Sequence, residues 1–352
     1  MNFAISNKKV GEDNPVFIVA ELSANHLQKF DLAVETIRAA KDAGADAVKL
    51  QTYTPDTLTI DAENEYFLIK HNTLWDGKTL YDLYQEAYTP WEWQPELKKI
   101  ADEVGIILFS TPFDTTSVDF LEEHVNVPAY KIASFEIVDI PLIEYVARKG
   151  KPIIMSTGMA SLEEIKEAVE AARKAGAGDI ALLKCTSAYP SLPEEMNLRT
   201  IPHLAETFQV VAGLSDHTLG IAVPVAAAAI GASVIEKHFT LSRNNGGPDA
   251  FFSLEPDEFR EMVEAIRIVE KALGEVYYGP TSQEEMNKVF RRSLFVVKDI
   301  MEGEILTEEH VRSIRPGCGL HPRFLKDIIG KRAKRDLKKG TPIQWGGVDE
   351  ER

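Results

Sequence analysis

One pattern recurs along this chain: a helical stretch ends near a glycine, and a short apolar segment then runs to a polar residue. It appears at 42–51, 174–186 and 230–238. Glycine suits the left-handed turn that closes a helix, and short apolar runs suit strands that are buried on both faces. Looser copies of the pattern occur at 16–22, 104–111, 127–134, 150–157 and 210–217. Together with the first three they make eight candidate strands.

The segments between these strands have the apolar periodicity of amphipathic helices. Residues 31–43 form one such helix with Asp31 as its expected N-cap, and 255–273 forms the last. The helix at 161–175 opens with a capping box, because Glu164 lies three residues after Ser161. Eight strands alternating with helices over roughly 250 residues predict a (β/α)8 TIM barrel. An open doubly wound sheet is the alternative, but no Gly-x-Gly-x-x-Gly turn follows the first strand.

Two regions do not fit the repeat. The connection at 53–104 is too long for an ordinary loop, and such insertions usually form lids or walls of a site. Its Trp75, Trp91 and Trp93 could equally just pack the insertion. After a linker-like stretch at 274–282, two related strand-turn units at 301–306 and 339–344 predict a small β-rich module. We divide the chain into a barrel domain (1–280), a linker (281–289) and a C-terminal domain (290–352).

Charge and composition exclude several classes of function. The net charge of −16 argues against general nucleic-acid binding, although 288–345 carries a local balance of +7. That basic module suits docking on the acidic remainder, within one chain or between two. Two cysteines make no disulfide framework, and the N-terminus lacks a signal peptide. The longest apolar run, 221–235, contains Pro224 and is too short to cross a membrane. We therefore expect a cytoplasmic protein that binds neither nucleic acid nor membranes.

Polar residues gather at the carboxyl ends of the candidate strands, where barrel enzymes keep their active sites. Lysines and hydroxyls recur there and together suit phosphate and carboxylate groups. The set is Glu21, Lys49, Gln51, Ser110, Thr111, Lys131, Ser134, Ser156, Thr157, Lys184, Thr186, Ser187, Ser215, Asp216, His217, Glu236 and His238. Side-chain alternation along each strand decides which of them face the barrel interior, so several must be structural.

Two histidines, His217 and His238, end consecutive strands of a strand-helix-strand unit. Parallel connection brings both strand ends to one rim, beside the strand that ends at Glu21. A single histidine is more often a core residue, but this pair with oxygen ligands fits Mn²⁺, Mg²⁺, Co²⁺ or Zn²⁺. We predict Mn²⁺, with Mg²⁺ or Co²⁺ as alternatives.

A series of motifs in order along the chain resembles the sialic acid synthase (nonulosonic acid synthase) family. They are Val-Ala-Glu-Leu-Ser-Ala-Asn-His, Ala-Val-Lys-Leu-Gln, Phe-Ser-Thr-Pro-Phe-Asp, Tyr-Lys-Ile-Ala-Ser, Ser-Thr-Gly-Met, Leu-Ser-Asp-His-Thr, Glu-Lys-His-Phe-Thr and Gly-Gly-Pro-Asp. The C-terminal module resembles the antifreeze-like (SAF, β-clip) domain of these enzymes. The resemblance implies condensation of phosphoenolpyruvate with an open-chain 2-acetamido sugar.

The resemblance also implies a role for individual residues. Those implied to hold phosphoenolpyruvate are Lys49, Thr111, Lys131, Ser134, Ser156, Ser187 and Ser215. His217 and His238 would bind the metal and act in catalysis with Glu21 and Gln51, while Tyr189 and Asp249 would contact the sugar. Arg315 would reach the acetamido group from the partner subunit of a domain-swapped homodimer.

Within the family, the segments 73–84 and 88–93 look most like pseudaminic acid synthases. The expected sugar is then a 2,4-diacetamido-2,4,6-trideoxy-L-altrose, with N-acetylneuraminate or legionaminate synthesis as alternatives. The chain departs from the family at Ser187, where neuraminate synthases have Asn, and at Leu27-Gln28, where Asn-Gly is usual. The sequence does not define the turn at Leu27-Gln28. A non-catalytic sugar- or anion-binding protein is the alternative of another class.

Overall fold

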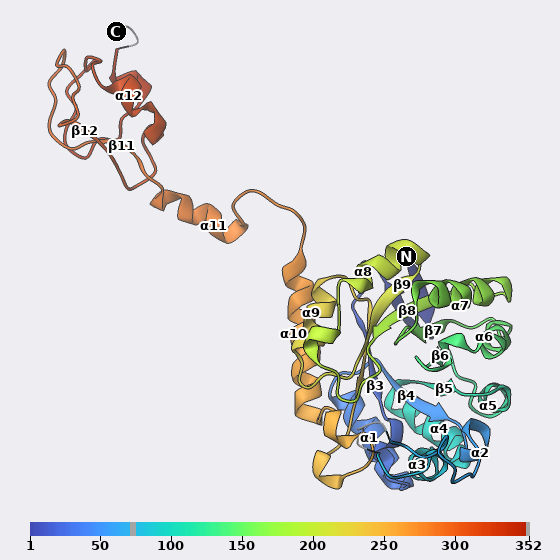
Figure 1. Ribbon diagram of the computed structural model, residues 1–352. Coiled ribbons are helices and arrows are strands. Elements are labelled where there is room, and N and C mark those ends of the chain that lie inside the picture. Colours follow the sequence, from blue (N-terminus) through green and yellow to red (C-terminus); the bar gives the residue numbers. More distant parts are fainter. Residues whose placement is uncertain (71–74, 350–352) are drawn as a thin grey trace. The chain divides into compact units, whose positions relative to one another are not determined.

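Eight parallel strands form a closed barrel in the computed structural model, which describes residues 1–70 and 75–349 (Figure 1). The order around the barrel is β10-β3-β4-β5-β6-β7-β8-β9, so strands close in sequence are neighbours and β10 closes on β3. The bounds are β3 Phe17–Glu21, β4 Ala47–Thr52, β5 Ile107–Pro112, β6 Tyr130–Ile132, β7 Ile153–Ser156, β8 Ile180–Cys185, β9 Val211–Asp216 and β10 Val234–His238. Each matches one of the eight candidate strands, and the predicted TIM barrel is confirmed.

Helices surround the barrel in the order expected from the sequence. They are α1 Phe30–Asp42, α4 Gln94–Val104, α5 Thr115–Phe120, α6 Ile140–Ala147, α7 Leu162–Lys174, α8 Thr200–Phe208, α9 Ala222–Ala229 and α10 Pro256–Leu273. The capping box is confirmed, because Glu164 N donates to Ser161 Oγ and Ser161 N donates to Glu164 Oε2. The predicted N-cap Asp31 is wrong: α1 starts one residue earlier, with Lys29 at the cap.

The strands are buried on both faces, so their near-continuous apolar runs pack against side chains inside the barrel and helices outside it. All five residues of β3 and all six of β9 are buried. Because the apolar contacts fill most of each strand, polar side chains on the barrel strands concentrate at the carboxyl ends. The fold thereby collects the candidate chemistry at one end of the barrel.

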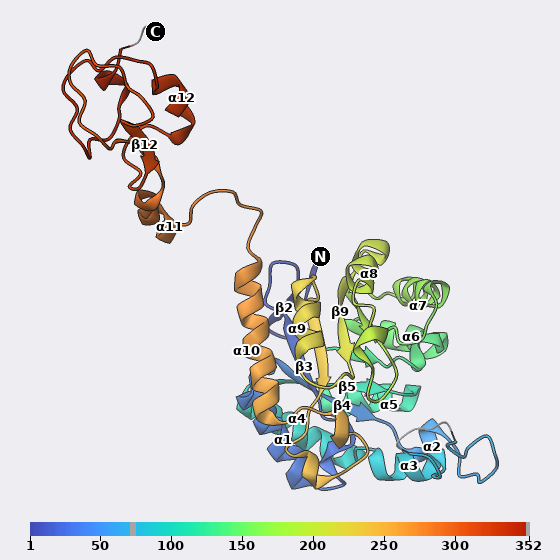
Figure 2. The ribbon, with the colours of Figure 1, turned by 60° about the vertical axis from the view of Figure 1, so that its left-hand side comes forward.

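The long insertion after β4 folds into α2 Pro55–Leu58 and α3 Leu80–Ala87, which lie at the end of the barrel toward which the strand arrows point (Figure 2). Trp91 Nε1 donates to Tyr53 O at 3.0 Å, and the Trp93 ring makes an edge contact with Phe30. Those two tryptophans therefore pack the insertion onto the barrel. Of the 73–84 motif used above, Thr73 and Leu74 lie outside the described residues.

The N-terminal residues form a hairpin that the sequence did not predict. Strands β1 Asn2–Ile5 and β2 Lys8–Gly11 pair antiparallel. Phe3, Ile5 and Val10 are buried in the same core as the barrel strands. Because β2 packs near β9 and precedes β3, the hairpin covers the amino-terminal end of the barrel, opposite the polar strand ends.

The chain divides into two compact units, Met1–Gly274 and Glu275–Arg352. The second unit contains α11 Ser282–Asn287, β11 Ser293–Val296, β12 Val311–Ile314 and α12 Leu325–Ile328, around its own core. β11 and β12 pair antiparallel, but 301–306 and 339–344 are not strands. Each is a turn, through Gly303 or Gly340, with one isolated bridge: Ile305 pairs with Arg332, and Pro342 pairs with Phe295 of β11. A single bridged residue does not make a strand.

Short helical turns complete the two units: η1 Ser23–His26, η2 Trp91–Trp93, η3 Leu121–Val125 (a π-helix), η4 Glu136–Val138, η5 Pro193–Glu195, η6 Arg243–Asn245, η7 Ala250–Phe252, η8 Lys288–Phe290, η9 Pro322–Phe324 and η10 Trp345–Gly347. Within the described ranges, no helix combines the length and the apolar character needed to span a bilayer.

Candidate active site

Strand alternation separates the polar strand ends into an inward and an outward set. Ser110 faces outward, where its hydroxyl bonds Thr52 at 2.6 Å, and Thr52 in turn donates to Gln94 of α4. Asp216 and Lys237 form a fully buried ion pair beside Thr218. These contacts hold strands and loops together, so Ser110 and Asp216 are structural members of the predicted set.

Lys49 is the centre of the inward set. Its Nζ lies 2.8 Å from Glu21 Oε2 and 3.3 Å from Glu236 Oε1, and donates to Thr111 Oγ1 at 3.1 Å. The strand register explains this grouping, because Glu21 pairs with Lys49 across β3 and β4. Gln51, two residues further on, donates to Glu21 Oε1 at 3.0 Å. These five side chains fix one another at the carboxyl ends of neighbouring strands.

Burial and charge oppose each other in this cluster. Burial raises the pKa of Glu21, and the neighbouring Lys49 only partly offsets it. Burial alone would lower the pKa of Lys49, but Glu21 and Glu236 raise it, so the ammonium stays charged. Burial alone would raise the pKa of Glu236, and Lys49 with Lys131 lowers it instead. Glu21 is thus the carboxyl of this cluster whose proton affinity is increased.

Lys131 has a different environment. Its Nζ donates to Ser156 Oγ at 2.6 Å and to Ile132 O at 2.9 Å, and within 1–70 and 75–349 it makes no ion pair at contact distance. Burial lowers the pKa of Lys131 to about 8, although Glu236 acts in the opposite direction. An anion beside this ammonium would supply the missing opposite charge and favour its protonated form.

A pair of serine hydroxyls lies beside Gly158, two residues after the Lys131 partner Ser156. Ser134 Oγ and Ser187 Oγ are 2.7 Å apart, and both approach the backbone of Gly158. A Cβ at Gly158 would come within 2.5 Å of Ser134 Cβ and 2.8 Å of Ser187 Oγ, so only glycine fits against these two serines. Hydroxyls, an ammonium and a glycine backbone at close range suit phosphate or carboxylate oxygens.

The two histidines are neighbours, as the strand-helix-strand unit predicts. The ring centroids of His217 and His238 are 5.4 Å apart. Tyr189 packs on His217 at 4.3 Å and Phe252 packs on His238 at 4.9 Å, so aromatic side chains enclose the pair. Trp75 from the insertion contacts Tyr189 at 5.9 Å, which extends this aromatic wall.

His238 has the properties of a metal ligand. Its Nδ1 is buried and has no hydrogen-bond partner, and burial with the nearby His217 and Lys49 holds its pKa well below the usual range. A neutral imidazole with an unshared nitrogen lone pair is the form that binds a cation. Across the described part of the chain, no three His, Cys, Asp or Glu side chains are grouped as metal ligands. The residues therefore fit a site in which two imidazoles are the protein ligands.

Asp249 and Ser23 form the side of the site beyond His238. Ser23 Oγ donates to Asp249 Oδ2 at 2.5 Å, and Gln51 Nε2 donates to Ser23 Oγ at 3.0 Å. His238 Nδ1 lies 4.0 Å from the same Asp249 oxygen. Burial raises the pKa of Asp249, while Ser23 lowers it. The predicted sugar residue Asp249 is thus linked to Glu21 through Ser23 and Gln51.

Two acidic residues of the site, Glu236 and Glu136, were assigned no role from the sequence. Glu236 joins Lys49 to Ser215, whose Oγ donates to Glu236 Oε1 at 3.4 Å. Glu136, in η4 after β6, is half-buried, and its Oε2 is buried without a hydrogen-bond partner; burial raises its pKa to about 7 against the effect of Lys131. The sequence placed Glu236 at a strand end, but only the barrel register shows that it faces inward.

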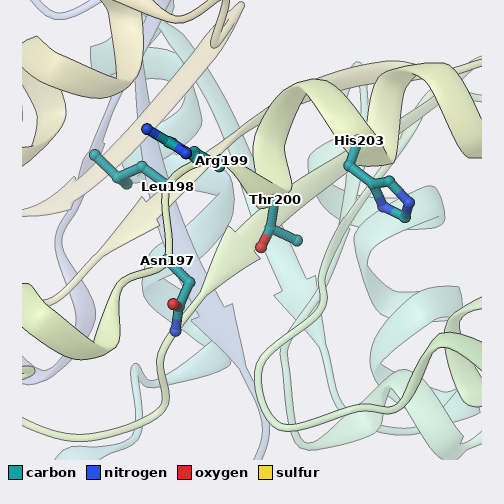
Figure 3. A pocket seen from close by; sticks show the side chains of 5 residues that line it. All are labelled: Asn197, Leu198, Arg199, Thr200 and His203. Atoms are coloured by element: carbon teal, nitrogen blue, oxygen red, sulfur yellow. The ribbon is translucent and has the colours of Figure 1, made fainter.

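Arg315 belongs to the second unit and is exposed one residue beyond β12, so it is not part of the group that the barrel itself assembles. A hollow of about 590 Å³ lies apart from that group, at the start of α8 (Figure 3). Asn197, Leu198, Arg199, Thr200 and His203 line it, and none of them was predicted for the site. The candidate site is therefore the inward group at the carboxyl ends of the barrel strands.

Comparison with known proteins agrees with this geometry. Residues 36–278 match the NeuB family, and 291–349 match the SAF domain. A pseudaminic acid synthase of Helicobacter pylori is 49% identical over 337 residues, covering 95% of this chain and 98% of that protein. The chain belongs to the NeuB family. The predicted family and the C-terminal SAF domain are both confirmed.

Two further members of the NeuB family show how far the similarity extends. An N,N'-diacetyllegionaminic acid synthase of Legionella pneumophila is 36% identical over 355 residues, covering 98% of this chain and 99% of that protein. The crystal structure of the spore coat polysaccharide biosynthesis protein SpsE of Bacillus subtilis covers all of both chains, with 38% identity and a TM-score of 0.66. The barrel and the SAF domain thus occur together in a solved relative.

Proposed function

We propose that this NeuB-family protein condenses phosphoenolpyruvate with 2,4-diacetamido-2,4,6-trideoxy-L-altrose and water, giving pseudaminic acid and phosphate. The observation that carries the proposal is the inward group at the barrel mouth, where lysines and hydroxyls suited to anions meet a pair of histidines and a buried carboxyl. The choice of sugar follows the higher identity to a pseudaminic acid synthase, 49%, than to a legionaminic acid synthase, 36%.

Phosphoenolpyruvate would occupy the lysine and hydroxyl part of the site. Lys131 is available because its present partners are a hydroxyl and a carbonyl oxygen, which leave its charge uncompensated. The hydroxyls of Ser134 and Ser187, which lie beside Gly158, offer donors to a phosphate or carboxylate. The remaining residues that we assign to this substrate are Lys49, Thr111, Ser156 and Ser215. Their donors would orient carbon 3 toward the sugar aldehyde.

His217 and His238 would hold a divalent cation, for which we propose Mn²⁺, with Mg²⁺ or Co²⁺ as alternatives. When bound, such a cation supplies Lewis-acid polarisation of the aldehyde. Tyr189 and Asp249, next to the histidines, would contact the sugar. Water exclusion would come from the aromatic wall formed by Phe252, Tyr189 and Trp75.

The reaction forms a bond between carbon 3 of phosphoenolpyruvate and the aldehyde carbon, and the aldehyde oxygen takes up a proton. Positive character then develops at carbon 2, and Glu21 is the carboxylate that would stabilise it and accept a proton from the water that adds there. The bond between carbon 2 and the phosphate oxygen then breaks, the new hydroxyl gives its proton to the leaving phosphate, and a ketone remains. Lys49 and Gln51 keep the Glu21 side chain in one orientation during these steps.

The test of this function is phosphate release from chelator-treated protein supplied with phosphoenolpyruvate and Mn²⁺. Three sugars are tested separately: the diacetamido-trideoxy altrose, N-acetylmannosamine and the legionaminate precursor. We expect metal-dependent release with the altrose, at least tenfold faster than with either other sugar, since a tenfold ratio needs only about 1.4 kcal/mol of discrimination. Phosphate release with one of the other sugars would support the same reaction, with that sugar as the substrate. Absence of release with all three would favour the sugar- or anion-binding protein.

We also propose that the active protein is a domain-swapped homodimer in which Arg315 of one subunit completes the site of the other. Apolar side chains are exposed on the loops that follow the barrel strands, which supports a partner subunit covering this end of the barrel. They include Phe135, Met159, Leu192, Leu219 and Phe251. The SAF domain carries positive charge that suits the acidic barrel domain.

Subunit mixing tests the dimer. Arg315→Ala leaves the barrel intact, and Glu21→Gln leaves the SAF domain intact, so each homodimer should be nearly inactive. Unfolding and refolding the two variants together should restore about a quarter of wild-type turnover if Arg315 acts in the partner's site, because random pairing makes half of the dimers mixed and each mixed dimer holds one complete site. Equal inactivity of the mixture and of the separate variants would contradict the swapped arrangement.

A further inference from the structure

The turn that follows β3, residues 22–29, has an unusual backbone at Leu27 and Gln28. Leu27 lies in the left-handed region at φ 50° and ψ 39°, and Gln28 follows at φ 55°. Residues with a Cβ rarely adopt this conformation, and two in succession are held only where surrounding contacts determine it. The contacts of the turn show what holds it.

On one side the turn is bonded to the insertion. Gln28 Nε2 donates to the carbonyl oxygens of Glu86 and Tyr88, where α3 ends and leaves carbonyls without helical partners. His26 Nε2 lies 3.2 Å from Thr89 Oγ1, and its ring makes an edge contact with Trp93 at 5.7 Å. The left-handed backbone brings Gln28 N to 3.1 Å from His26 Nδ1 and so fixes the imidazole.

On the other side the same turn is bonded to the loop after β10. Ser23 Oγ donates to Asp249, and Asn25 Nδ2 donates to Phe239 O and Ser253 Oγ, each at 2.9 Å. The Leu27 side chain fills the space beside Gly247, where a Cβ would come within 2.6 Å of Leu27 Cδ2. The six residues 23–28 thus connect the segments 86–93 and 239–253, which lie far apart in the sequence.

We infer that Leu27 and Gln28 are positioning residues that set the sugar-binding half of the site by tying the insertion to the β10 loop. The inference rests on the proposed function, because it takes Asp249 and the aromatic wall as the sugar side. The residues assigned to phosphoenolpyruvate lie on other strands, and within the described ranges none of them bonds to Leu27 or Gln28. Loss of the tie should therefore change sugar use and leave phosphoenolpyruvate use nearly unchanged.

The first experiment measures both KM values in Gln28→Ala and Gln28→Gly. We expect the sugar KM to rise about tenfold in both variants, as for loss of one to two positioning hydrogen bonds, with the phosphoenolpyruvate KM within about twofold of wild type. Gln28→Gly should have the higher melting temperature of the two, because glycine adopts the left-handed backbone readily. If Gln28 only stabilised the fold, both variants would melt at a lower temperature than wild type. The sugar KM would then not rise relative to the phosphoenolpyruvate KM.

The chain offers a matched control in Gln209→Gly. Gln209 has a similar left-handed backbone, φ 52°, and its side-chain amide also donates to a backbone carbonyl, that of Glu206, but it precedes β9 at the other end of the barrel. This variant should keep both KM values. Equal rises of both KM values in the Gln28 variants, or no rise, would overturn the inference while wild-type turnover still supports the proposed function.

Hydrogen exchange gives a test that does not depend on turnover. In Gln28→Gly, amides of 84–93 and 246–253 should exchange at least about tenfold faster than in wild type, and those of β7 and β8 should not change. If wild type turns over none of the sugars, the proposed function fails. Hydrogen exchange would still test whether Gln28 links the insertion to the β10 loop. Unchanged exchange at 84–93 would show that Gln28 does not hold the insertion.

Discussion

Glu21→Gln should lower kcat by about 10²–10⁴-fold, the usual contribution of a positioned acid–base group, and should leave both substrates bound. The amide has the volume of the carboxyl and can still accept from Gln51, so the strand end should keep its shape. It cannot accept a proton or balance positive charge at carbon 2. Since the substitution also removes one negative charge beside Lys49, the phosphoenolpyruvate KM should stay equal or fall.

The measurement is steady-state phosphate release, with binding of phosphoenolpyruvate followed separately by calorimetry. Glu122→Gln is the matched control, because Glu122 also accepts from a lysine, Lys151 at 2.9 Å, and from Tyr130, but lies in η3 outside the site. Its kcat should remain close to wild type. Near-normal kcat in Glu21→Gln would remove the assigned role, and equal losses in both variants would point to folding instead.

His238→Gln should weaken binding of Mn²⁺ by at least about 100-fold, beyond the 10–100-fold expected from loss of an outer-shell partner. The ligands that we propose are the imidazoles of His217 and His238, and the Nδ1 of His238 is buried without a hydrogen-bond partner. Turnover should fall at least as far, because the variant would remain without a cation at ordinary Mn²⁺ concentrations. Titration of free Mn²⁺ by electron paramagnetic resonance measures the binding without any need for activity.

His203→Gln is the control for this prediction. His203 lies on α8 in the hollow of Figure 3, where it bonds Thr207 on the same helix. The control should bind Mn²⁺ as wild type does. Wild-type affinity in His238→Gln would exclude the histidine pair as the metal site. Full phosphate release from chelator-stripped wild type would exclude a metal requirement altogether.

The barrel strands could be predicted because each one is marked by the residues within and just before it. Each barrel strand is a short apolar run that follows a glycine-closed helix, and such runs are compatible with few arrangements other than burial on both faces. The same rule brings polar strand ends to one rim, so Lys49, Lys131, His217 and His238 could be assigned to one site before any geometry was known. The N-terminal hairpin escaped prediction because Phe3, Ile5 and Val10 are buried only by packing on an already closed barrel.

What the sequence alone determined is the fold of the barrel, the family and the rim on which the chemistry lies, because periodicity and motif order are local properties. The tertiary structure decided which strand-end residues face inward. For strands buried on both faces the sequence carries no polar alternation to separate the two sides, so Ser110 and Glu236 could not be told apart. The tertiary structure also decided the left-handed turn at Leu27 and Gln28. The contacts that hold this turn come from residues 86–93 and 247, which are remote in sequence and become adjacent only after the barrel closes.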